Sequence, residues 1–120
     1  MNLETLIKLA IEGELRLHHI DSHIGGNEVS RTEMFNSLAI RVAREFQQNK
    51  LGFEDADHAA NLIWSAMVQD SLEHAEGYKF AQPAYDIYEA FDAGEYGHKT
   101  GINPIEINTR PRINEILKNA

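Results

Sequence analysis

Apolar residues recur at intervals of three and four along most of this chain, which is the spacing of one face of an α-helix. The pattern predicts four main helices, at about residues 2–23, 30–49, 54–76 and 83–94, and a short C-terminal helix that starts at Pro111. No comparable alternation of apolar and polar residues predicts a strand. Because short connections favour antiparallel neighbours, we expect an all-α, single-domain helical bundle over residues 1–120.

Local signals mark several of the predicted helix ends. Ser30 and Glu33 form a capping box, S-x-x-E, at the start of the second helix. Gly77 follows the third helix, where glycine can adopt the left-handed conformation that closes helices. Pro83 fits the first turn of the fourth helix. Residues 95–108 are rich in glycine and contain a proline, so we expect a loop with at most one helical turn.

Stepping each helix at 100° per residue separates inward positions from outward ones. In the third and fourth helices the inward arc includes the only tryptophan of the chain and one of its four tyrosines. The core residues predicted in these two helices are Ala56, Ala60, Ile63, Trp64, Met67, Ala84, Ile87, Tyr88 and Phe91.

Charge is distributed unevenly along the sequence. The chain has 19 acidic and 11 basic residues, a net charge of −8. Residues 51–96 alone hold ten carboxylates and one lysine, a net charge of −9, together with all four tyrosines. This balance argues against direct nucleic-acid binding and against an anionic membrane surface, both of which require basic residues. It is compatible with a basic protein partner.

Three absences narrow the class of protein further. The chain has no cysteine, which excludes disulfide and thiol chemistry. It has no run of the ~18 apolar residues that a membrane span needs. Glu4, Glu12 and Glu14 lie among the apolar residues of the N-terminal stretch, so we do not expect a secretory signal. We therefore expect a cytoplasmic protein, and no motif indicates a cofactor.

The outer side of the fourth helix combines a large aromatic residue with carboxylates. Tyr85, Glu89 and Asp92 share this side because they lie three and four residues apart. Tyrosine supplies a large contact area, while carboxylates attract a basic partner and fix its orientation. The residues that we predict to bind the partner are Glu73, Glu76, Tyr85, Asp86, Glu89, Asp92 and Glu95, with Tyr78 and Tyr96 as additional anchors.

Polar residues at the edge of the apolar arcs suggest an alternative. Glu14, His18 and Asp21 follow one side of the first helix, and Asp70 and His74 follow one side of the third. Carboxylates and neutral imidazoles ligate divalent metals, and helical bundles use such sets in their cores. The same five residues are also compatible with a salt-bridge network between the two helices.

No motif in the sequence is specific enough to name a reaction, so we expect binding rather than catalysis. In size, acidity and helicity the chain is similar to bacterial immunity proteins, which neutralise nuclease toxins. That likeness of overall profile implies an inhibitor that occupies the basic cleft of its target. The alternatives are a metal-binding bundle protein or enzyme that uses the five residues named above, and a self-associating bundle in which the aromatic face forms a homodimer.

Overall fold

The computed structural model describes residues 2–25, 30–74, 76–95 and 103–120. All regular structure in these residues is helical, which confirms the all-α class. The described part of the chain forms six α-helices and one π-helix, in the order α1 (Leu3–Ile11), α2 (Leu17–Ile24), α3 (Arg31–Gln47), α4 (Phe53–Ser71), α5 (Ala84–Asp92), η2 (Ile105–Thr109) and α6 (Arg110–Lys118).

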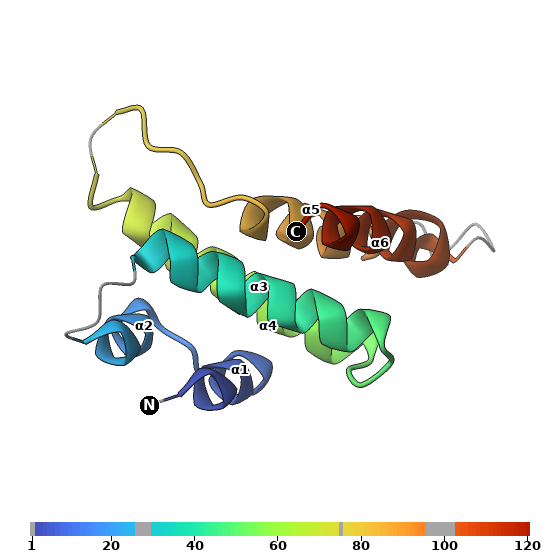
Figure 1. The fold of residues 1–120 in the computed structure, drawn as a ribbon, viewed down its shortest axis with the longest axis horizontal. Helices are drawn as coiled ribbons and strands as arrows, with labels where there is room; N and C mark the ends of the chain where they lie inside the picture. Colours follow the sequence, from blue (N-terminus) through green and yellow to red (C-terminus); the bar gives the residue numbers. More distant parts are fainter. Residues whose placement is uncertain (1, 26–29, 75, 96–102) are drawn as a thin grey trace.

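The two longest helices, α3 and α4, form an antiparallel pair at the centre of the fold (Figure 1). The short helices α1 and α2 pack on one side of this pair. Helices α5 and α6 pack on the opposite side, and α5 runs antiparallel to α4. Residues 72–83 connect α4 and α5, and the described residues 72–74 and 76–83 pass along one end of the molecule.

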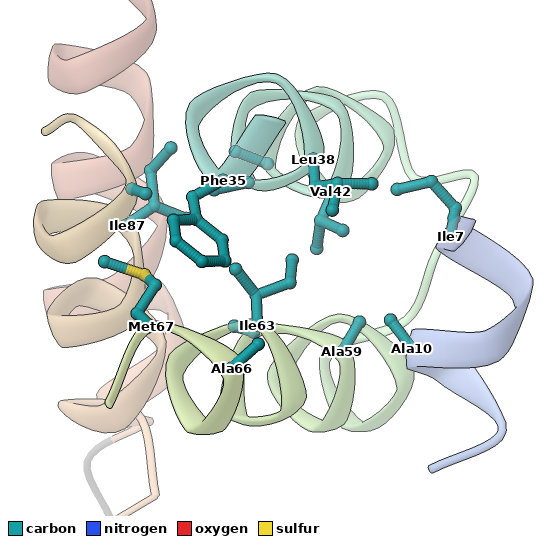
Figure 2. Close-up of a cluster of buried hydrophobic side chains, with 14 of the residues drawn as sticks. Ile7, Ala10, Phe35, Leu38, Val42, Ala59, Ile63, Ala66, Met67 and Ile87 are labelled. Atoms are coloured by element: carbon teal, nitrogen blue, oxygen red, sulfur yellow. The ribbon is translucent and has the colours of Figure 1, made fainter. Parts of the chain in front are cut away.

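The core lies between the central pair and both flanking layers. Figure 2 shows Phe35, Leu38 and Val42 of α3 pointing toward α4, with Ile87 of α5 closing one side. Each of these side chains is fully buried, and burying an apolar side chain of this size stabilises the fold by about 2 kcal/mol. On α4, Ala59 is also buried, and a helix face with such a small residue lets α1 approach closely.

The predicted first helix is wrong as a single element, because α1 and α2 are separated by a turn. Gly13 has φ of +79°, a left-handed conformation that suits glycine, and its amide donates to the carbonyl of Ala10 at 3.2 Å. Helix α2 begins after Arg16, whose amide donates to Nδ1 of His19 at 3.0 Å. Ala10 and Leu17 are buried on either side of the turn, and their separation of seven residues is why the apolar spacing looks continuous.

Other predicted boundaries are partly confirmed. The Ser30 cap is present, because its hydroxyl accepts from the amide of Glu33 at 3.1 Å. Helix α4 ends at Ser71 rather than at residue 76, and the following Leu72 is 80% exposed, so no packing extends the helix. The last helical segment starts earlier than predicted, with η2 running directly into α6.

Gly94 fixes the end of α5 against its neighbours. A Cβ at this position would lie 2.4 Å from Oγ1 of Thr109 and 2.8 Å from the ring of Phe53. The Thr109 hydroxyl is buried and donates to the carbonyl of Ala90 at 2.7 Å, so it cannot move without losing that bond. Only glycine therefore allows the end of α5, the end of η2 and the start of α4 to meet this closely.

We expect Gly94→Ala to lower the free energy of unfolding by about 2 kcal/mol, because the added methyl group overpacks this junction. Urea unfolding followed by circular dichroism measures the change. Gly52→Ser is the matched control, since a Cβ there meets nothing within 4 Å and the hydroxyl can cap α4. Equal stability of Gly94→Ala and the unmodified protein would show that the junction can relax.

Candidate functional site

Four aromatic side chains form a contiguous, half-buried surface where α4, the connector and α5 meet. Trp64 lies at its centre. Its ring centroid is 4.8 Å from that of Phe80, 5.5 Å from that of Tyr85 and 4.7 Å from that of Tyr88, on which it stacks at 12°. We refer to Trp64, Phe80, Tyr85 and Tyr88 as the aromatic face. Such ring pairs add about 1 kcal/mol each beyond the burial of their area.

The sequence places these rings together through helical spacing on two antiparallel helices. Tyr85, Tyr88 and Asp92 are three and four residues apart on α5, so they follow one side of it. Trp64 and Asp57 are seven residues apart on α4, which also puts them on one side. Trp64 and Tyr88 were predicted as core residues, but both remain partly exposed. Periodicity gives the correct side of each helix, but Trp64 and Tyr88 lie where α4 and α5 meet, and the described residues leave both partly uncovered.

Three carboxyl groups lie at one end of the aromatic face, and we refer to Asp57, Asp92 and Glu95 as the carboxylate cluster. The negative charges of Glu95 and Asp92 act on Asp57, and the buried Oδ1 of Asp57 has no hydrogen-bond partner among the described residues. Burial and then the charge of Glu95 raise the pKa of Asp57 to about 7, and burial raises the pKa of Glu95 as well.

The surroundings of the carboxylate cluster add further negative charge. A cleft of about 620 Å³ opens beside Glu95, and Glu54 and Asp55 line it together with Phe53 and Ile105. Within the described residues, none of the ion pairs with lysine or arginine reaches the cluster. The acidic end of the aromatic face is therefore not neutralised by the described part of the chain.

A second polar group lies at the opposite end of α4, around Asp70. The Asp70 side chain is 4% exposed, and its Oδ1 accepts from Nη1 of Arg31 at 2.8 Å. The same guanidinium pairs with both oxygens of Asp21 and with Glu73. The Tyr78 hydroxyl donates to Oδ2 of Asp70 at 2.5 Å. We refer to these residues, with His74, as the polar cluster.

The sequence allowed either a metal site or a salt-bridge network around Asp70, and the hydrogen bonds of the polar cluster match the salt-bridge network. Burial alone would raise the pKa of Asp70, but hydrogen bonds from Tyr78, Arg31 and His74 outweigh it and hold that pKa below its ordinary value. Asp21, Asp70 and His74 do belong to one network, as predicted, and a cation from α3 joins them. Arg31 was not predicted to take part, because its partners are distant in the sequence. The arrangement is a salt-bridge network that ties α2, α3 and α4 together.

The other members of the predicted metal set do not join this network. Glu14 lies in the turn between α1 and α2, and both Glu14 and His18 are exposed. The break at Gly13 removes the continuous helical register that aligned them with Asp21. In the part of the chain that the structure describes, no group of three or more acidic or histidine side chains is arranged to hold a metal ion.

The residues predicted to bind a partner are divided among several surfaces. Tyr85 belongs to the aromatic face, Asp92 and Glu95 to the carboxylate cluster, and Glu73 to the polar cluster, while Glu76 is exposed in the connector. Asp86 and Glu89 instead line a groove between α5 and α6, beside Arg112 and Ile116. Tyr78 contacts Phe80 edge to face at 5.4 Å, and Tyr96 lies outside the described residues.

Comparisons with known proteins found no matching family model, curated protein or solved structure. Among the described residues, no helix combines the length and apolar character that crossing a membrane requires.

We expect Arg31→Met to lower the free energy of unfolding by about 2 kcal/mol, because it leaves the buried carboxylate of Asp70 without its cation. Adding Asp70→Asn to this variant should restore part of the loss, since the amide is neutral and still accepts from Tyr78. Urea unfolding of both variants measures these differences.

Arg41→Met is the control for this pair of variants. It breaks the ion pairs of Arg41 with Glu4 and Glu45, and both of these glutamates are more exposed than Asp70. The loss of stability should therefore be smaller. An equal loss in Arg31→Met and Arg41→Met, or no recovery with Asp70→Asn, would contradict the proposed role of the polar cluster.

Proposed function

We propose that this chain is a binding protein and that it docks a basic protein through the aromatic face and the carboxylate cluster beside it. The observation that carries the proposal is the ring stack centred on Trp64, which is assembled from three segments and left half-exposed. The proposal keeps Tyr85, Asp92 and Glu95 from the predicted binding residues, and it adds Trp64, Tyr88 and Asp57.

The aromatic face has the composition of a binding centre. Tryptophan and tyrosine dominate the energetics of protein interfaces because they bury a large area and lose little rotamer freedom. Their hydroxyl and indole groups can bond to a partner while the rings exclude water. Tyr85 and Tyr88 lie on the same side of α5 and both contact Trp64, so one partner surface can cover all three rings.

Charge favours a basic partner over other occupants. Between residues 51 and 96 the sequence has one lysine and no arginine, against ten carboxylates. The field of such a surface raises the association rate of a basic protein and lowers that of an acidic one. A second copy of this chain would bring the same acidic surface against itself, so a homodimer through this face is disfavoured.

One specific form of the proposal is an inhibitor of immunity type. An acidic protein that presents aromatic anchors can occupy the basic cleft of a nucleic-acid-processing enzyme, because its carboxylates take the place of phosphates. The chain would then act by blocking access to that cleft. The size, acidity and helicity of the chain support this form.

Charge reversal at the end of the aromatic face tests the docking site. We expect Asp92→Lys/Glu95→Lys to weaken capture of the partner at least tenfold, because it replaces two attractive charges by repulsive ones. Immobilised protein recovers candidate partners from a lysate, and each candidate is then purified and titrated. A ¹⁹F label on Trp64, the only tryptophan of the chain, reports whether the partner covers the rings.

Two matched variants make the result specific. Glu12→Lys/Glu14→Lys changes the net charge equally at exposed positions on the far side of the fold, and Asp86→Lys/Glu89→Lys does so in the α5–α6 groove. Both should retain binding. Loss of binding only in the groove variant would place the interface between α5 and α6 and would overturn the proposed face. Sedimentation of the free protein identifies self-association.

A further inference from the structure

We propose that His19 is a pH-sensitive cap, which holds the junction between α1 and α2 in place while its ring is neutral and releases the junction when the ring takes up a proton. The α1–α2 junction is the segment of residues 12–16, between the end of α1 and the start of α2. The cap acts within the free protein and is independent of the docking proposed above.

Two reciprocal hydrogen bonds join Arg16 to His19. The backbone amide of His19 donates to the carbonyl of Arg16 at 3.0 Å, and the backbone amide of Arg16 donates to Nδ1 of the His19 ring, also at 3.0 Å. The second bond is one half of a capping box, with an imidazole in the place that glutamate or glutamine ordinarily takes. Because Nδ1 accepts in this bond, the ring is neutral and carries its proton on Nε2.

Protonation of His19 removes this acceptor. A charged imidazole has a donor on each of its two nitrogens, so Nδ1–H would point at the N–H of Arg16. The two donors repel each other, and the ring has to turn away. The bond lies at an exposed position, so water can replace the lost acceptor. The cap can therefore be released without unfolding the protein.

Other contacts keep the α1–α2 junction attached to the core when the cap is released. Leu15 and Leu17 are buried, and the guanidinium of Arg16 donates to the carbonyl of Leu15 at 2.8 Å. The junction also forms one wall of a cavity of about 290 Å³, whose other wall consists of Leu62, Ser65, Ala66 and Gln69 of α4. Release of the cap therefore changes the backbone of the junction and the shape of this cavity, while the helical core persists.

The groups beside the His19 ring favour its neutral form. The ring of His18 lies next to it, with the two centroids 4.0 Å apart. Burial, followed by the charges of His18 and Arg16, lowers the pKa of His19, and the charge of Glu14 in the junction opposes them. The hydrogen bond to Nδ1 and the charges around the ring thus act in the same direction.

The helices packed against α2 present charged groups elsewhere. The residues of α4 that line the cavity do not ionise, and the ring of His58 lies against the junction. Arg31 of α3 meets α2 at Asp21, within the polar cluster. On α1, Lys8 pairs with Glu12. The charges on α2 and in the junction therefore dominate the titration of His19.

The direction of the stability change follows from the lowered pKa. An unfolded histidine takes up its proton at about pH 6.5, whereas His19 in the folded protein resists protonation to a lower pH. Below pH ~6.5 the unfolded state therefore binds more protons than the folded state, which favours unfolding. The stabilisation by the cap is complete above pH ~6.5 and is lost as the pH falls through the pKa of folded His19.

The ring of His19 can be followed directly by ¹H–¹⁵N NMR of the unmodified protein. We expect the proton on Nε2 at pH 7.5, a titration midpoint below that of histidine in the unfolded chain, and a change of the Arg16 amide signal with the same midpoint. Exchange of that amide with solvent, corrected for its intrinsic pH dependence, should become about fivefold faster once the ring is charged. A proton on Nδ1 at pH 7.5, or an Arg16 amide that does not follow the ring, would overturn the cap.

Substitutions at His19 separate the acceptor from the charge. His19→Gln keeps a side-chain acceptor at the capping position but cannot take up a proton. Relative to this variant, the unmodified protein should lose about 3 °C in melting temperature between pH 7.5 and pH 5, and His19→Ala should melt below His19→Gln at both pH values. His23→Gln, in the last turn of the same helix, is the control, and its Arg16 amide should still titrate with His19. An equal pH dependence in the unmodified protein and His19→Gln would show that His19 is not the switch.

Discussion

The packing of α4 against both layers of the fold is the constraint on which the other features depend. Helix α4 contacts α1 and α2 on one side and α5 on the other, with α3 alongside it. Its buried face includes Ala56, Ala59, Ala60 and Ala66, and such small side chains let neighbouring helices approach closely. The two ends of α4 then have opposite surroundings, with the carboxylate cluster at its start and the polar cluster at its end.

The two clusters show that neighbours, rather than burial alone, decide the state of a carboxyl group. Asp70 is the more buried of the two aspartates, yet its pKa lies below the ordinary value because Tyr78, Arg31 and His74 donate to it. Asp57 is less buried, but burial raises its pKa, the charges of Glu95 and Asp92 add to the rise, and no donor offsets it. A buried carboxylate that accepts several hydrogen bonds keeps its charge and holds its neighbours in place. A carboxylate without such hydrogen bonds has a raised pKa and changes its protonation with pH.

The sequence predicts the helices better than it predicts the site. Apolar spacing reports which side of a helix is inward, and the cap at Ser30 is visible locally. The turn at Gly13 is missed because Ala10 before it and Leu17 after it are both buried and lie seven residues apart, which is two helical turns. The excess of acid in residues 51–96 indicates a charged surface, but the effect of Glu95 on Asp57 and the pairing of Arg31 with Asp70 depend on tertiary packing, which spacing within one helix does not contain.

The chain of rings that leads from Trp64 through Phe80 to Tyr78 has a thermodynamic consequence. Phe80 and Tyr78 belong to the connector, and their contacts with Trp64 and with Asp70 hold that segment at two points. A segment already held in place loses less conformational entropy when a surface closes over it. The contacts of Tyr78 and Phe80 therefore lower the entropy that this part of the connector would lose on contact, and the proposed docking would draw on the polar cluster without touching it.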